Sequence, residues 1–113
     1  YANGLSSPLA DLAETQALKA ALGERAYQVP VTALKSMLGH MIGAAGGVQT
    51  ASLVNTLNHG VVPPTINLDN PAQGCDLDYT PHTAREGEFR TGLATAFGFG
   101  GMNAALVLRR FEG

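Results

Sequence analysis

The sequence has 113 residues, of which 45% are hydrophobic and 14% are charged, and its formal net charge is −2. A chain of this length forms one domain around one core, and its few charged residues indicate that some apolar surface meets another segment or subunit. The seven lysines and arginines are scattered, so no basic face can neutralise phosphates and nucleic acid is not an expected partner.

The single cysteine, Cys75, excludes an internal disulfide, and the three histidines lack the short spacing of common metal sites. We therefore expect a cytoplasmic protein without a bound metal. The longest apolar stretch, residues 41–57, contains Gln49, Thr50, Ser52 and Asn55 and is a poor membrane span. The first residue is a tyrosine and no signal-peptide pattern follows it, which favours a fragment or a processed chain.

The first predicted helix runs from Pro8 to Leu22. Ser7 is a suitable N-cap because its hydroxyl can accept a hydrogen bond from an otherwise unpaired backbone amide, and a proline suits the first helical position. Asp11 and Glu14 lie near the positive end of the helix dipole, and Gly23 ends the helix.

A strand and a second helix are predicted next. Residues 27–33, YQVPVTA, alternate in polarity like a short strand, and Pro30 places it at a sheet edge or a strand end. The second helix is predicted over about residues 39–58, with Gly60 supplying the left-handed residue that ends it. Because small or apolar residues occur on every side of this helix, we expect it to be buried in the middle of the fold.

The C-terminal part is predicted to contain an irregular segment and then a hairpin. Residues 61–71, VVPPTINLDNP, include paired prolines and turn residues, so they form an extended surface crossing. Residues 92–111 hold two strand-like runs separated by GFGG at 98–101, a glycine-rich reversal. This order of elements predicts an α/β domain in which a helix packs on a sheet.

The stretch KSMLGHMIGAAGG, residues 35–47, combines groups that can carry chemistry. His40, at the predicted helix start, meets a positive dipole end that keeps its ring neutral, so it can donate a hydrogen bond or accept a proton. Lys35 lies in an otherwise uncharged segment, where an ammonium needs a partner or loses its proton. A histidine that only caps a helix and a solvated loop lysine explain the same pattern.

The glycines and the cysteine also allow a functional and a purely structural interpretation. The helical glycines at 43, 46 and 47 cost about 0.8–1 kcal/mol each relative to alanine, a cost that is tolerable only if another backbone comes close. The backbone amides near Phe99 are candidates for an oxyanion hole, although most glycine-rich reversals are only turns. Cys75 is rejected as a nucleophile because its neutral and acidic neighbours disfavour a thiolate. His59 and His82 are interpreted as solvated.

Four motifs then occur together in one order: SPLADLAE (7–14), KSMLGHMIGAAGG (35–47), VVPPTINLDNPAQGCDLDYTPH (61–82) and FGFGGMNAALVL (97–108). Together they resemble the C-terminal part of the β-ketoacyl-acyl carrier protein synthases over essentially the whole chain. The resemblance implies a thiolase-like αβαβα layered sandwich. Residues 1–113 would form most of its C-terminal half, with a mixed sheet, a buried central helix and a terminal hairpin, and the N-terminal half would be missing.

The resemblance also implies a reaction, its partners and its residues. The family performs a decarboxylative Claisen condensation of acyl and malonyl thioesters carried on the phosphopantetheine of an acyl carrier protein, without a permanently bound cofactor. It works as a dimer, and its nucleophilic cysteine lies in the missing half. By position, His40 and Lys35 match catalytic residues, and Phe99, between Gly98 and Gly100, matches the gating phenylalanine of the oxyanion hole. Asp11 and Glu14 match acidic positions that support the site.

Several positions depart from the family pattern. The family usually has HGTGTP where this chain has NGLSSP (3–8), so Asn3 stands at the first catalytic histidine and Leu5 at a threonine that contacts pantetheine. Ser7 stands at the second threonine of that pattern and retains its hydroxyl. Gln49 replaces a glutamate associated with the lysine, and Met102 replaces the threonine after FGFGG. A buried Lys35 would then lack its counter-charge, which lowers its pKa.

Asparagine can still donate a hydrogen bond to a thioester carbonyl, but it does not titrate near neutrality. The leading interpretation is therefore a family member with a degenerate condensing site, which pairs with an active ketosynthase and shapes its acyl tunnel, as a chain-length factor does. The alternative is an active 3-oxoacyl-acyl carrier protein synthase that uses Asn3 and His40 with an upstream cysteine. An isolated binding module of 113 residues is a third reading, disfavoured because the helix and hairpin would lack their other half.

Overall fold

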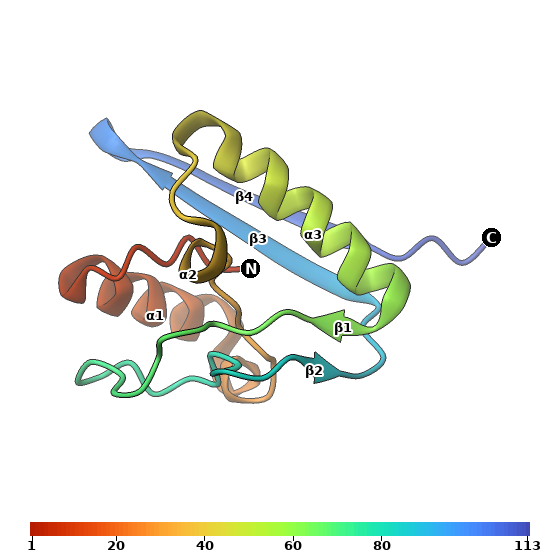
Figure 1. Ribbon diagram of the computed structural model, residues 1–113, viewed down its shortest axis with the longest axis horizontal. Coiled ribbons are helices and arrows are strands. Elements are labelled where there is room, and N and C mark those ends of the chain that lie inside the picture. Colours follow the sequence, from red (N-terminus) through yellow and green to blue (C-terminus); the bar gives the residue numbers. More distant parts are fainter.

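A long helix lies across an antiparallel hairpin in the computed structural model, which describes residues 1–113 (Figure 1). The helix α3 (Ala45–His59) packs on β3 (Thr91–Gly98), which pairs with β4 (Met102–Arg109). Leu53, Leu57 and Ala94 form the buried cluster between helix and hairpin. The predicted α/β arrangement and the terminal hairpin are confirmed.

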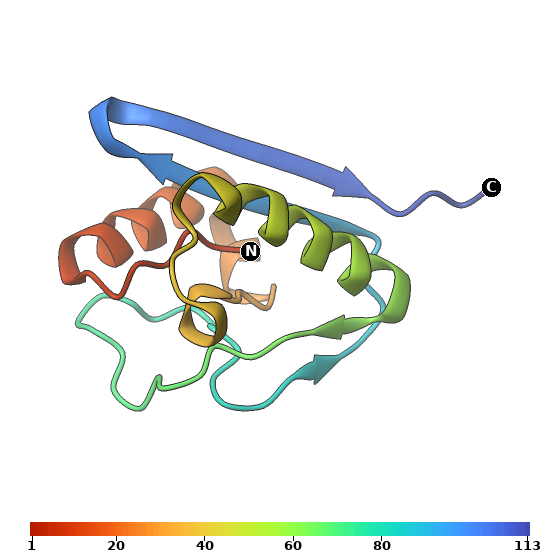
Figure 2. The same ribbon diagram turned by 45° about the horizontal axis from the view of Figure 1, so that its top comes forward.

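The hairpin reverses where the glycines were expected to allow it. The two strands pair in register from Thr91 opposite Arg109 to Gly98 opposite Met102. Between them, Phe99–Gly101 form a short turn in which Gly100 has φ 78° and Gly101 has φ 80°. Side chains at these angles are strained, so glycine is required here. Figure 2 shows β4 on the outer side of the hairpin, farther from α1 than β3 is.

The first helix has the predicted bounds. The helix α1 (Pro8–Leu22) begins with a proline and ends at Gly23, which has φ 57° and opens the short 3-10 helix η1 (Gly23–Tyr27). The predicted cap is wrong in one respect, because the Ser7 side chain makes no capping hydrogen bond. The Asp11 carboxylate accepts a hydrogen bond from the amide of Leu5, which precedes the helix, at 3.0 Å.

The strand predicted over residues 27–33 is wrong. The 3-10 helix η1 continues to Tyr27, and residues 28–34 belong to no strand. Their backbone bonds are few, with the Val31 amide donating to Asp78 O at 2.8 Å and the Ala2 amide donating to Thr32 O at 2.9 Å. The segment is therefore an extended crossing between distant parts of the chain.

The second helix starts later than predicted. A separate short helix α2 (Lys35–Leu38) ends at Gly39, which has φ 75°, and the 3-10 helix η2 (Ile42–Ala44) precedes α3. Ile42 adopts φ 49°, a left-handed conformation that interrupts a continuous helix. The predicted end is confirmed, since Gly60 has φ 70° and its amide bonds to Thr56 O at 2.8 Å.

Burial of α3 differs from the expectation of a helix covered on all sides. One face is buried, through Gln49, Leu53, Thr56 and Leu57. A Cβ atom at Gly46 or Gly47 would meet no heavy atom within 4 Å. The close backbone approach that these glycines predicted is therefore not made by any of residues 1–113.

The segment after α3 is mostly irregular, as predicted. The short strand β1 (Val61–Val62) pairs with β2 (Arg85–Glu86). Two ion pairs anchor the polypeptide between them, Lys19 with Asp76 and Arg85 with Asp78. No helix of the chain combines the length and apolarity that crossing a bilayer requires.

Candidate functional site

Asn3 contacts two elements at once, α2, which begins with Lys35, and β3. Its side chain is 5% exposed, and its Oδ1 accepts hydrogen bonds from Lys35 Nζ at 3.2 Å and from the Phe97 amide at 3.3 Å. Its backbone oxygen also accepts from Lys35 Nζ, at 2.5 Å. Two donors on Oδ1 set the orientation of the amide group. Asn3 thus connects the start of α2 to β3.

Glu14 lies beneath the same loop and holds it from the other side. The buried carboxylate accepts hydrogen bonds from the amides of Asn3 at 2.8 Å and Gly4 at 2.9 Å, and from Thr95 Oγ1 at 2.7 Å. A Cβ atom at Gly4 would lie 2.6 Å from the Cβ of Ala33, so only glycine lets the two segments pass this closely. Glu14 therefore joins α1, the first loop and β3.

Burial lowers the pKa of Lys35, and the negative charge of Glu14 opposes this effect. The predicted direction is confirmed, but the predicted lack of a counter-charge is wrong. Gln49 is engaged elsewhere: its Nε2 donates to Tyr1 O at 2.6 Å and to Thr95 O at 3.1 Å. Gln49 thereby ties α3 to the sheet, while Glu14 supplies the charge that faces the lysine.

His40 lies in the exposed connection between α2 and η2. Because α3 begins only at Ala45, His40 is not at the start of a long helix. The predicted effect of a helix dipole on its ring is therefore wrong. The ring is instead oriented by the Ile42 amide, which donates to His40 Nδ1 at 3.0 Å. A neutral ring with an accepting Nδ1 carries its proton on Nε2, so it presents a donor to any group placed there.

Phe99 is fully exposed at the tip of the hairpin, and Gly98 and Gly100 beside it are also exposed. Figures 1 and 2 both place this tip at the same end of the molecule as the beginning of α3. The tip and the connection that carries His40 belong to two different parts of the chain, since the connection precedes η2 and the tip joins β3 to β4. Met102, which follows the glycines of the turn, is also exposed.

Other candidate residues lie outside this cluster. Ser7 is half-buried at the start of α1. Cys75 is half-buried beside a cavity of about 120 Å³ that Asp11 and Glu14 also line. His82 contacts Asp69 at 3.3 Å. No group of three or more histidine, cysteine, aspartate or glutamate side chains is arranged to hold a metal ion.

Thr95 belongs to the network but was not identified from the sequence. Its hydroxyl bonds to the Glu14 carboxylate at 2.7 Å, and its amide bonds to Tyr1 O at 3.0 Å. A threonine in the middle of a strand is ordinary, because β-branched residues favour strands. No local pattern separates it from its neighbours.

Comparison with known proteins gives a consistent result. Residues 1–69 match a family described as "Beta-ketoacyl synthase, C-terminal domain". The chain is 49% identical over 109 residues to 3-oxoacyl-[acyl-carrier-protein] synthase 2 of Coxiella burnetii, covering 96% of this chain and 26% of that protein. It is 50% identical over 111 residues to the granaticin polyketide putative beta-ketoacyl synthase 1 of Streptomyces violaceoruber, covering 98% and 26%.

Solved structures agree with these relatives. A type II polyketide acyl-carrier protein in complex with its ketosynthase contains a chain that matches with TM-score 0.95 and 36% identity, covering 98% of this chain and 27% of that one. The ishigamide ketosynthase/chain length factor matches with TM-score 0.92 and 32% identity, covering 98% and 27%. The chain therefore has the mixed α/β fold of the corresponding part of ketosynthases, and it spans about a quarter of the relatives it matches.

Proposed function

Since the chain belongs to the β-ketoacyl synthase family, we propose that it is most of the C-terminal half of a partner subunit for fatty acid or polyketide synthesis whose own condensing site is degenerate. Such a subunit resembles a chain-length factor: it pairs with an active ketosynthase and shapes the tunnel for the acyl chain. The missing N-terminal half would complete the layered sandwich.

The observation that carries this proposal is the position of Asn3. At the place implied for a catalytic histidine, the chain has a buried amide whose Oδ1 is occupied by Lys35 Nζ and the Phe97 amide. An amide does not titrate near neutrality, and the hydrogen bonds of this one are made within the fold. Lys35 points to the same residue, because its Nζ also bonds to Asn3 O. Both groups are thus used to hold the loop.

The partners follow from the same family. One solved ketosynthase is bound to an acyl-carrier protein, and another solved structure is a ketosynthase/chain length factor. For this chain we infer an acyl carrier protein, with substrate on its phosphopantetheine, and a ketosynthase as homo- or heterodimer partner. Ser7 would contact the pantetheine arm. We expect no permanently bound cofactor and a cytoplasmic location.

An active 3-oxoacyl-acyl carrier protein synthase is the second candidate. It is favoured by His40, whose accepting Nδ1 leaves a proton on Nε2 of the neutral ring. The His40 Nε2–H and the Phe99 backbone amide would donate hydrogen bonds to a thioester oxyanion. An upstream cysteine would be the nucleophile. The residue at the upstream nucleophile position separates the two candidates, because a cysteine favours the enzyme and a glutamine favours the partner subunit.

The first prediction concerns catalysis. The full-length protein, mixed with malonyl-acyl carrier protein and an acyl donor, is expected to release carbon dioxide at a negligible rate. Loss of one donor to a developing oxyanion costs about 2.7–4 kcal/mol, which is about a hundredfold to a thousandfold in rate. Carbon dioxide release is measured with and without an active ketosynthase as partner. Brisk turnover by the protein alone would refute the proposal and support the second candidate.

The second prediction concerns residues 1–113 expressed alone. Their exposed apolar side chains include Leu9, Ile42, Phe99, Met102, Val107 and Phe111. Apolar surface of this kind, left uncovered, drives association. We therefore expect the isolated segment to aggregate or to be poorly soluble, as judged by size-exclusion chromatography and light scattering. A monomer that melts cooperatively would show that the segment does not need another half.

A further inference from the structure

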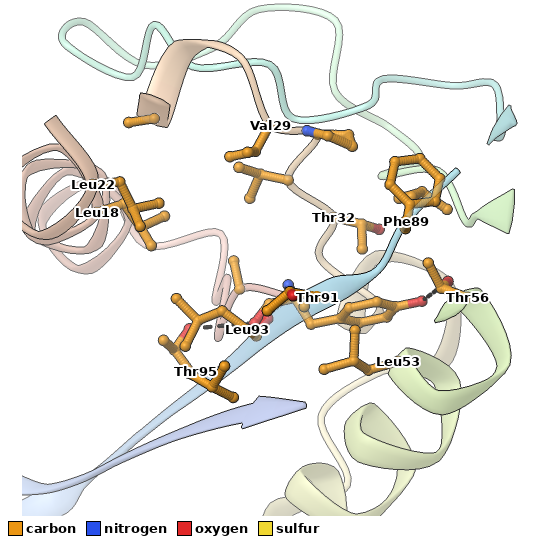
Figure 3. Close-up of a pocket in the computed structure, with 18 of the residues that line it drawn as sticks. Leu18, Leu22, Val29, Thr32, Leu53, Thr56, Phe89, Thr91, Leu93 and Thr95 are labelled. Atoms are coloured by element: carbon orange, nitrogen blue, oxygen red, sulfur yellow. Dashed lines mark hydrogen bonds between the residues drawn. The ribbon is translucent and has the colours of Figure 1, made fainter. Parts of the chain in front are cut away.

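The helix α2, which carries Lys35, is not fixed by apolar packing within residues 1–113. It has only four residues, and none of them is buried. A helix this short is not stable by itself. The crossing at residues 28–34 leads to it past a mainly apolar cavity of about 370 Å³, which Val29 and Thr32 line (Figure 3). Other contacts therefore decide where Lys35 lies.

Two hydroxyl groups hold the start of α2 against the segment that follows β1. The Ala33 amide donates a hydrogen bond to Thr65 Oγ1 at 3.0 Å. Ser36 Oγ donates to Ala33 O at 2.8 Å and accepts a hydrogen bond from the Ile66 amide at 3.0 Å. Figure 2 shows α2 next to this segment. Directly before the helix, Ala33 is thus bound through both of its backbone groups.

Ala33 also meets the loop that contains Asn3. A Cβ atom at Gly4 would lie 2.6 Å from the Cβ of Ala33, so the two segments are in close contact. Two residues after Ala33, Lys35 Nζ donates to Asn3 O at 2.5 Å and to Asn3 Oδ1 at 3.2 Å. A displacement of Ala33 would therefore change how the ammonium meets its acceptors.

Thr65 is itself held by a strained part of the chain. Its amide donates to Thr80 O at 2.9 Å, and its oxygen accepts a hydrogen bond from the His82 amide at 3.0 Å. Thr80 has φ 52° and His82 has φ 61°. A β-branched residue rarely adopts a positive φ, and such strain persists only where the surroundings fix it. Buried Thr80 is fixed by its hydroxyl, which donates to Val31 O at 2.8 Å, and by its amide, which donates to Asp78 Oδ1 at 3.1 Å.

We propose that Thr65 and Ser36 are positioning residues of the candidate site. They fix Ala33, and through its backbone they hold the Lys35 ammonium against Asn3. Neither hydroxyl bonds to the lysine itself, so both act through Ala33. The inference goes beyond the proposed function and applies to a partner subunit and to an active synthase alike, because it concerns how the site is held together.

The pKa of Lys35 in the full-length protein tests this role, because it reports how deeply the ammonium is buried. Burial lowers this pKa, and Glu14 on α1 is the charged group that opposes the effect. Thr65→Val keeps the shape of the side chain but removes the acceptor of the Ala33 amide. The released ammonium becomes hydrated, so we expect its pKa to rise toward the ordinary value of 10.5. Ser36→Ala is expected to shift it in the same direction.

The pKa is measured by trace acetylation with acetic anhydride over a range of pH, followed by mass spectrometry of the peptide that contains Lys35. Only the neutral amine reacts, so the pH profile of labelling gives the pKa. Thr65→Ser keeps the hydroxyl and is expected to restore the profile of the unmodified protein. Thr83→Val, at an exposed position of the same segment, is the matched control and is expected to leave the profile unchanged.

Lys19 is the reference within the same samples. Its ion pair with Asp76 raises its pKa, which we expect to stay unchanged in every variant. An unchanged Lys35 pKa in folded Thr65→Val and Ser36→Ala proteins would overturn the proposal and leave the two hydroxyls a purely structural role. A Lys19 pKa that also moves toward 10.5 would show a general loosening and would overturn it as well. If Thr65→Val does not fold, the half-buried Ser36→Ala position decides the question. Carbon dioxide release judges the proposed function separately.

Discussion

Replacing Glu14 with alanine is expected to lower the free energy of unfolding by about 3–5 kcal/mol, the range for breaking a buried charged network. The substitution leaves two backbone amides, those of Asn3 and Gly4, and the Thr95 hydroxyl without their acceptor. It also removes the negative charge that opposes the lowering of the Lys35 pKa. Urea unfolding of the full-length protein measures the loss.

Two matched variants test the cause of this loss. Glu24→Ala removes a carboxylate from the exposed 3-10 helix η1, and its effect is expected to stay within about 0.5 kcal/mol. Glu14→Gln keeps the shape and one acceptor oxygen, so its effect should lie between the two. Equal, small effects of Glu14→Ala and Glu24→Ala would show that the network does not stabilise the fold.

The effect of Glu14→Ala also has an expected pH dependence. In the folded protein, burial lowers the pKa of Lys35 below its ordinary value of 10.5. In the window just below 10.5, the unfolded chain therefore binds more protons than the folded one. Stability therefore rises with pH through that window. Without Glu14 the pKa falls further, and the destabilisation is expected to shrink as the pH rises and Lys35 loses its proton. A destabilisation that grows with pH would contradict this account.

Elements with local signals could be predicted from the sequence. Pro8 and Gly23 bound α1, and the glycines of GFGG permit the turn between β3 and β4. Residues 27–33 could not be predicted, because their partners are Asp78 and Ala2, which are distant in sequence. The start of α3 was also missed, since nothing local signals the left-handed conformation of Ile42.

The candidate site divides in the same way. The sequence motifs made Lys35, His40 and Glu14 candidates, because each belongs to a stretch that resembles the family. They did not reveal that Glu14 faces the loop of Asn3 or that Gln49 binds the carbonyls of Tyr1 and Thr95. These contacts depend on how α1, α3 and β3 meet. Sequence motifs thus identify residue types, and tertiary packing decides which groups each one serves.

Leu53→Ala is expected to lower the free energy of unfolding by about 2–5 kcal/mol, the range for a buried leucine truncated to alanine. Leu53 is 2% exposed and packs with Leu57 and Ala94 where α3 crosses β3. Removing it leaves a cavity at the main contact between helix and hairpin. The neighbouring Val54→Ala is the control: Val54 is 42% exposed on the same helix, and its effect is expected to stay below about 1 kcal/mol.

The partner of Leu53 on the strand makes this prediction specific. A Cβ atom at Gly92 would lie 2.2 Å from Leu53 Cδ1, so Gly92→Ala alone is expected to cost about 1–3 kcal/mol through overpacking. In the double variant, the added methyl group enters space that the shortened side chain has vacated. The destabilisation of the double variant should then be smaller than the sum of the two single effects by about 1 kcal/mol or more. Strict additivity would mean that α3 and β3 do not meet through this pair, because residues that share one space cannot be altered independently.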